Sequence, residues 1–106
     1  MSGLGGGTGP SPEPVVACDQ LWFIAQIASP KEDVVEQLYV GCMLDIVIGD
    51  QNGQSVVFAY WQDHEVGGIA DRRLQRLRQC MNEGHMFSAR VISISSGQVR
   101  VQISPI

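Results

Sequence analysis

Hydrophobic residues occur in this chain as short runs separated by glycine, proline and small polar residues, a pattern typical of a small β-rich domain. The run 21–28 is rich in aromatic and β-branched side chains and predicts a first strand. Residues 43–48 alternate aliphatic and other side chains, and the segment 55–61 follows Asn52-Gly53, a pair that favours a tight hairpin turn. Apolar residues occupy both faces of 55–61, so we expect that strand to be central and buried on both sides.

The second half of the chain predicts three more strands. Residues 65–69 predict a short strand whose two glycines permit a bulge or a close approach of backbones. Residues 87–94 and the segment from Gln98 to Ile103 alternate apolar and polar side chains around a Ser-Ser-Gly turn and predict a closing hairpin.

Two helices are predicted between these strands. Ser29 followed by Pro30, with Glu32 three residues after the serine, predicts a capped helix of about two turns that ends before Gly41. A second helix is predicted over 71–83. It begins at a capping Asp71 and stops at Gly84, its apolar face is formed by Leu74, Leu77 and Met81 with Cys80 beside them, and Arg72, Arg76 and Gln79 are expected on the opposite face.

This order of elements predicts a mainly β (α+β) domain, a small six-stranded and partly open β-barrel with two helices. Residues 1–17 are dominated by glycine and proline and predict a disordered tail, which leaves 18–106 as a single compact domain. The chain starts with no basic leader and carries no run of about 18 apolar residues, so we expect a cytoplasmic protein without a membrane segment. Its three cysteines lack paired spacing, and we expect reduced, partly buried thiols rather than a disulfide.

The net charge of −4 is unevenly distributed along the chain. Residues 1–69 carry nine acidic side chains against one lysine, a net charge of −8, whereas residues 70–106 carry six arginines against two acids, a net charge of +4. An anionic partner would therefore meet the C-terminal third of the chain.

The segment 56–91 resembles the HIRAN domain, a small β-barrel module found with helicases and nucleases and also as a stand-alone protein. The resemblance rests on the hairpin that leads into 65–69, on Arg73, Leu74 and Leu77 in the following helix, and on Gly84 and 89–91 in the next strand. It implies a HIRAN-like or OB-like barrel. In the family, an Asn-Pro-Tyr-Asp-like element before the hairpin helps to hold the 3′ end of single-stranded DNA. The corresponding residues 50–57 contain neither proline nor tyrosine, so the resemblance implies the fold without this element.

Two groups of residues are candidates for binding. The guanidinium groups of the second helix match phosphate oxygens, and two aromatic side chains of 55–61 offer stacking faces; this candidate ligand-binding set is Arg72, Arg73, Arg76, Arg78, Tyr60 and Trp61. The competing interpretation is that the arginines solvate the outer face of a helix. Trp22 and Phe23 are adjacent on a strand and point to opposite sides, so one of them is expected to be exposed or at an interface.

Catalytic and metal-binding patterns are not apparent. His64, His85, Cys18, Cys42 and Cys80 carry zinc-binding atoms, but no local spacing pairs two of them, and we expect no metal and no cofactor. Asp63, His64 and Glu65 lie in a predicted turn, where polar residues are common. We therefore expect a non-enzymatic binding or adaptor module, an accessory protein that acts through protein–protein contact. The alternative is HIRAN-like binding of single-stranded DNA through the arginine-rich helix. The oligomeric state stays open, since strand edges permit self-association.

Overall fold

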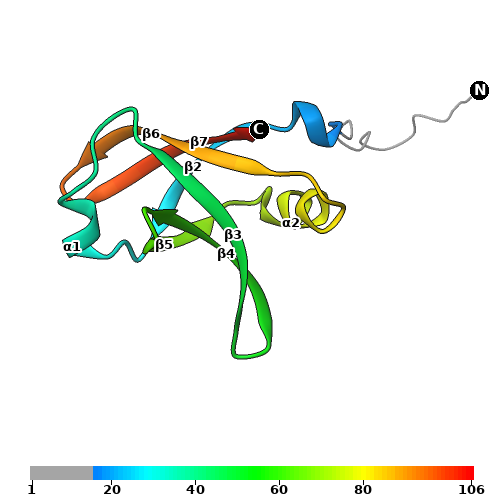
Figure 1. Cartoon of the computed structure of the whole chain (residues 1–106), viewed down its shortest axis with the longest axis horizontal. Helices are drawn as coiled ribbons and strands as arrows, with labels where there is room; N and C mark the ends of the chain where they lie inside the picture. Colours follow the sequence, from blue (N-terminus) through cyan, green and yellow to red (C-terminus); the bar gives the residue numbers. More distant parts are fainter. Residues whose placement is uncertain (1–15) are drawn as a thin grey trace, which may run out of the picture.

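The computed structural model describes residues 16–106, so the predicted tail lies outside the described residues except for Val16 and Ala17. Six strands and two α-helices account for most of the described chain (Figure 1). The elements are a 3₁₀ helix η1 (Cys18–Gln20), β2 (Phe23–Ala28), α1 (Glu32–Val35), β3 (Met43–Gln51), β4 (Gln54–Trp61), β5 (His64–Ala70), α2 (Leu74–Asn82), β6 (Phe87–Ser95) and β7 (Gln98–Pro105).

The six strands form a closed antiparallel ring in the order β2-β5-β4-β3-β6-β7. The predicted mainly β fold with two helices is confirmed, but the barrel is closed rather than partly open. Closure depends on β2, which pairs along one edge with β5, from Gln26 to Ala28, and along the other with β7, from Phe23 to Gln26. A closed ring leaves fewer free edges for non-specific pairing with other chains.

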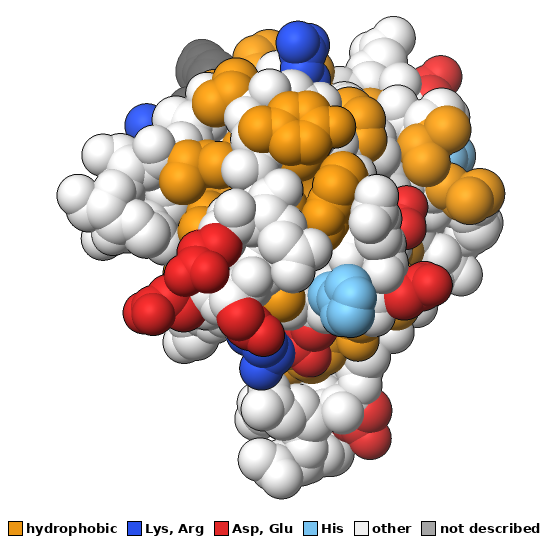
Figure 2. Space-filling view, turned by 60° about the vertical axis from the view of Figure 1, so that its left-hand side comes forward, with side chains coloured by type: hydrophobic (Ala, Val, Ile, Leu, Met, Phe, Trp, Pro, Cys, Tyr) orange, Lys and Arg blue, Asp and Glu red, His pale blue; other side chains and the backbone are white. Residues whose placement is uncertain are grey.

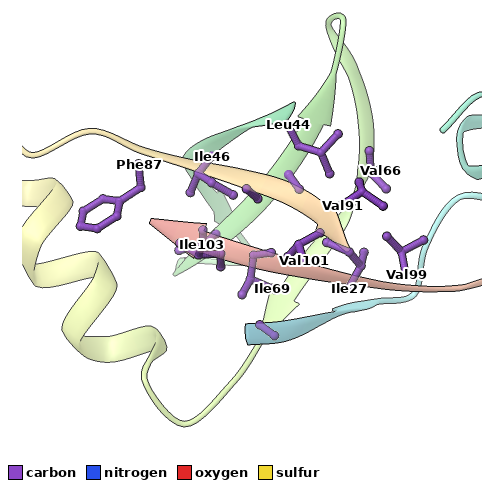
Figure 3. Packing of buried hydrophobic residues seen from close by; sticks show 14 of the residues in the cluster. Ile27, Leu44, Ile46, Val66, Ile69, Phe87, Val91, Val99, Val101 and Ile103 are labelled. Atoms are coloured by element: carbon purple, nitrogen blue, oxygen red, sulfur yellow. The ribbon is translucent and has the colours of Figure 1, made fainter. Parts of the chain in front are cut away.

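One side chain in two along each strand points into the ring and forms the core (Figure 3). In β4, Val57 and Ala59 are buried inside, whereas Val56, Phe58 and Tyr60 are half-buried on the outside. The expectation that β4 is buried on both faces is therefore wrong. A closed ring has only one interior, so each of its strands has a single inward face.

Gly67 allows two neighbouring strands to approach closely. A methyl group at this position would lie 2.6 Å from Ile27 Cγ2 and 2.7 Å from the carbonyl oxygen of Ala28. The pairing of β4 with β5 also shifts register next to Gly67, between Ala59 and Tyr60. The predicted role of these glycines in a bulge and a close approach is confirmed at Gly67.

The helix ends predicted from the sequence agree only in part with the observed ends of α1 and α2. Ser29 has a φ of +49° and α1 begins at Glu32, so Ser29 does not cap this helix. Instead, the N–H of Lys31 donates to the Val66 carbonyl (2.8 Å) and fixes the start of α1 on β5.

The second helix begins at Leu74, three residues after Asp71. The Asp71 carboxylate accepts a hydrogen bond from the Arg73 N–H (2.8 Å) and so orders the turn that precedes the helix. At the other end, Gly84 adopts a φ of +102°, and the N–H groups of Gly84 and His85 donate to the carbonyls of Met81 and Cys80. This is a Schellman motif, and it confirms Gly84 as the predicted stop.

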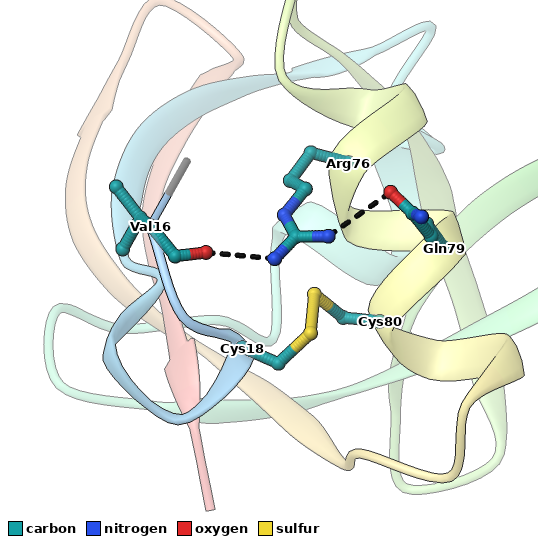
Figure 4. Close-up of a disulfide and its surroundings, with 5 residues drawn as sticks. All are labelled: Val16, Cys18, Arg76, Gln79 and Cys80. Atoms are coloured by element: carbon teal, nitrogen blue, oxygen red, sulfur yellow. Dashed lines mark hydrogen bonds between the residues drawn. A yellow bond between two sulfur atoms is a disulfide. The ribbon is translucent and has the colours of Figure 1, made fainter. Parts of the chain in front are cut away.

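Cys18 and Cys80 form a disulfide between η1 and α2 (Figure 4). The expectation of three reduced thiols is therefore wrong for these two cysteines, while Cys42 is free and buried. The two bonded cysteines are 62 residues apart in the sequence, so only the closure of the ring brings them together.

Candidate interaction surface

Large hydrophobic side chains are exposed at three places on the described part of the protein. Tyr39, Val40 and Met43 follow α1 in the sequence, and a second group surrounds Trp22. A third group lies beside the part of β3 that is not paired with β6. Exposed apolar patches of this kind mark binding surfaces more often than isolated apolar residues do.

The first group lies on a turn that is held rigidly against the ring. The Cys42 N–H donates to the Tyr39 carbonyl (3.0 Å). The turn is bonded to β6 by two further hydrogen bonds: the Gly41 N–H donates to the Val91 carbonyl (2.8 Å), and the Val91 N–H donates to the Cys42 carbonyl (2.9 Å). Gly41 has a φ of +102°, a conformation that glycine adopts without strain. The turn therefore presents its side chains in a fixed arrangement.

Tyr39 and Val40 are the most exposed side chains of this turn, at 60% and 63% of their surface, and Met43 is 52% exposed. The ring of Tyr39 packs edge-on against Trp61, with centroids 6.0 Å apart. Trp61 is half-buried and packs against the core. We call Tyr39, Val40, Met43 and Trp61 the Tyr39 surface.

Acidic side chains lie close to the Tyr39 surface in the sequence. Helix α1 exposes Glu32 and Asp33, and Glu36, which follows the helix and precedes Tyr39 by three residues, is also exposed. On the face that includes α1, hydrophobic side chains gather in one area and acidic side chains in the area beside it (Figure 2). This face therefore has an apolar area with acidic side chains on one side of it, while the exposed Arg90 pairs across the sheet with Met43.

Sequence reasoning predicted Trp61 as a site residue but missed Tyr39, Val40 and Met43. The signal was present as two large apolar residues directly before Gly41, where a predicted helix gives way to a loop. Apolar side chains in a loop have no core-facing periodicity to account for them.

Three of the four arginines predicted to bind phosphate are engaged within the protein. Arg73 donates to Asp71 and lies 4.7 Å above the ring of Phe23. Arg76 donates to the Val16 carbonyl (2.8 Å) and to Gln79 (3.0 Å), and Arg78 donates to the Ser55 carbonyl (3.0 Å). Arg72 is exposed.

Arg76 was expected on the face opposite Cys80, but it lies beside the disulfide (Figure 4). Positions four apart in a helix are only about 40° apart around its axis, so Arg76 and Cys80 share one side of α2.

The structure does not bring the arginines to the predicted stacking residues. Arg78 contacts Ser55 near the start of β4, whereas Trp61 is the last residue of the same strand. Six residues of extended chain span about 20 Å, so a phosphate held by Arg78 lies far from Trp61. Tyr60 packs edge-on against Phe58, with centroids 6.5 Å apart.

The second exposed group forms a hollow around Trp22. Trp22 is 59% exposed and lines this hollow together with Arg73 and Arg100. Phe23 is 1% exposed and belongs to the core. The prediction that one of these two aromatic residues is exposed is confirmed for Trp22, whereas Phe23 is buried.

The third group lines a groove beside an unpaired strand edge. Strand β3 pairs with β6 only from Met43 to Asp45, although it continues to Gln51. Val47, Met86 and Ile106 are exposed along this groove.

Asp63 lies in a turn, as predicted, whereas His64 and Glu65 are the first two residues of β5. Gln62 and Asp63 have φ values of +48° and +71° and connect β4 to β5. Glu65 forms an ion pair with Lys31 (3.6 Å), and the three side chains are half-buried or exposed.

Hydrogen bonds from Arg73 hold the pKa of Asp71 below its usual range, and burial opposes this effect only in part. Because the folded pKa is lowered, Asp71 stabilises the fold above the unfolded pKa, near 4, and this contribution disappears as the pH falls through the lowered folded value. We expect Asp71→Asn to lower the free energy of unfolding by about 1 kcal/mol at pH 7 and by much less at pH 2. Urea unfolding at both pH values measures the difference, with the exposed Asp45→Asn as control. An equal loss at both pH values would contradict this assignment.

Comparisons with models of known protein families, with curated proteins and with solved structures find no match for this chain. The HIRAN-like resemblance therefore stays a prediction from the sequence. Within residues 16–106, no helix has the length and apolar character needed to cross a membrane.

Proposed function

We propose that this protein is a non-enzymatic binding module that engages another protein through the Tyr39 surface. The observation that carries the proposal is the exposure of Tyr39 and Val40 on a turn anchored to β6 and of Met43 at the start of β3, which follows it. A rigid surface loses little conformational entropy on binding, and tyrosine, tryptophan and methionine are enriched in protein interfaces.

The charge beside this surface indicates the kind of partner. Glu32 and Asp33 of α1 and the adjacent Glu36 are exposed acids, and acidic side chains beside an apolar surface favour a partner with basic side chains next to an apolar patch. The partner proposed here is therefore a protein with an apolar patch bordered by lysine or arginine. A cytoplasmic accessory role, which the sequence predicts, is consistent with this proposal.

Val40→Asp tests this function with little risk to the fold, because Val40 is 63% exposed. We expect the free energy of unfolding to change by less than about 0.5 kcal/mol. A charge inside an interface costs about 2 kcal/mol or more of binding free energy, which weakens the affinity at least about 30-fold. We therefore expect native affinity capture with this variant to recover correspondingly less of the partner. The exposed Gln54→Asp on β4 is the matched control. Equal recovery by the two variants would exclude the Tyr39 surface.

A second function, binding of single-stranded DNA, is favoured by the hollow around Trp22. An exposed indole beside Arg73 and Arg100 combines a stacking face with charges that match phosphate. This site differs from the predicted one, since it uses Trp22 in place of Trp61 and Tyr60.

The two tryptophans permit a direct optical test of DNA binding. In a Trp61→Phe variant, fluorescence comes from Trp22 alone, and a DNA-binding protein would show quenching by an oligonucleotide that weakens steeply with salt. Arg100→Ala in this background should then weaken binding about 10-fold. Unchanged fluorescence at low salt would exclude this second function.

A further inference from the structure

The fold gathers three zinc-binding side chains at one end of α2, and a fourth is bonded to one of them. Cys18 Sγ, a carboxylate oxygen of Glu83 and a ring nitrogen of His85 all lie within 4.8 Å of one another. Cys80 does not belong to this group, but its Sγ is bonded to Cys18 Sγ and so lies directly beside it. Sequence spacing alone indicated no metal site, because Cys18 comes from a distant segment.

Local structure fixes these four positions. Cys18 is contributed by η1, and Cys80 lies in the last turns of α2, where both side chains are buried. The Schellman motif at Gly84 turns the chain back, and the His85 N–H donates to the Cys80 carbonyl (3.0 Å). Glu83 and His85 are exposed and therefore free to adjust their side chains.

We propose that this cluster binds one Zn²⁺ when the disulfide is reduced, through Cys18 Sγ, Cys80 Sγ, the His85 imidazole and the Glu83 carboxylate. A dithiol reductant supplies two electrons and two protons, becomes a disulfide itself and leaves two thiols on the protein. Zn²⁺ then displaces both thiol protons to solvent and is held by two thiolates. This inference is independent of the Tyr39 surface.

The separation of the two sulfur atoms after reduction suits a zinc site. Zinc–sulfur bonds of about 2.3 Å in a tetrahedral site place two sulfurs about 3.8 Å apart, which is close to the contact distance of two separate sulfur atoms. Two thiolates, one imidazole and one carboxylate are a ligand set typical of zinc sites.

Arg76 places a positive charge beside the cysteine pair. Its guanidinium lies beside the disulfide (Figure 4), and its Nε is buried without a hydrogen-bond partner among the described residues. Its positive charge would balance the excess negative charge that two thiolates and a carboxylate bring to Zn²⁺. The cysteine pair would thus join η1 to α2 as a disulfide in oxidising surroundings and through zinc in reducing ones.

Metal analysis of the full chain tests this proposal. Protein reduced with a phosphine and incubated with Zn²⁺ is expected to retain one zinc per chain after desalting, whereas the oxidised protein retains none. Co²⁺ in place of zinc should give the intense visible absorption of a tetrahedral site with thiolate ligands. A reduced chain that retains no zinc would overturn the proposal.

Matched variants identify the ligands. His85→Ala and Glu83→Ala alter exposed side chains, and circular dichroism of the oxidised variants checks that the fold is intact. Each is expected to weaken zinc binding about 100-fold or more, since even residues behind the ligands contribute 10- to 100-fold. His64→Ala and Cys42→Ala are the controls and should retain the metal. Zinc binding that survives both ligand variants, or that depends equally on a control residue, would contradict the assignment.

Discussion

Reduction of the Cys18–Cys80 disulfide in the presence of a chelator is expected to lower the free energy of unfolding by about 4 kcal/mol. The bond closes a loop with a sequence separation of 62 residues, and a crosslink of that length removes much of the entropy of the unfolded chain. This is a large effect, because small domains are stable by only about 5–15 kcal/mol.

Urea unfolding of the oxidised and reduced protein measures this difference. Thiol titration provides the control, since the folded oxidised protein should yield a single thiol, Cys42, after denaturation without reductant. Three thiols under these conditions, or equal midpoints for the two forms, would contradict the disulfide. Addition of Zn²⁺ to the reduced form should restore stability if the proposed metal site exists.

The second large effect is expected from Gly67→Ala, which should destabilise the protein by about 3 kcal/mol. The added methyl would lie 2.6 Å from Ile27 Cγ2 and 2.7 Å from the Ala28 carbonyl oxygen. A side chain can rotate away, but the backbone oxygen moves only if β2 moves, and β2 closes the ring by pairing with both β5 and β7.

Gly68→Ala is the matched control for this prediction. The nearest atom to a methyl at Gly68 is the Val57 carbonyl oxygen, at 3.8 Å, which is an ordinary contact. We expect this variant to stay within about 0.5 kcal/mol of the parent protein. Thermal unfolding of the two variants measures the contrast, and equal midpoints would show that β2 and β5 are not packed as closely as described.

Strands and turns were predictable here because they depend on neighbouring residues. Alternation in 43–48 and the Asn52-Gly53 pair identify the hairpin of β3 and β4, and the structure gives positive φ values of 54° and 80° at these two residues. Gly84 identifies the end of α2 for the same reason. These signals act over a few residues and need no knowledge of the fold.

Closure of the ring and the disulfide were not predictable, because they join distant segments. Nothing near Cys18 in the sequence indicates Cys80, and Arg76 and Arg78 find carbonyl acceptors on Val16 and Ser55 only after folding. The internal contacts of these arginines could not be predicted for the same reason. The helix that carries these arginines was predicted, but helical periodicity does not reveal which backbone carbonyls their side chains contact.

Site-specific cross-linking tests the central claim most directly, namely that the Tyr39 surface binds another protein. A photo-reactive amino acid is placed at Val40 on this surface and, in a second sample, at the exposed Gln54 on β4. We predict a defined cross-linked protein from Val40, absent from Gln54 and lost when Met43→Asp is added. The same products from both positions, or none from Val40, would contradict the claim.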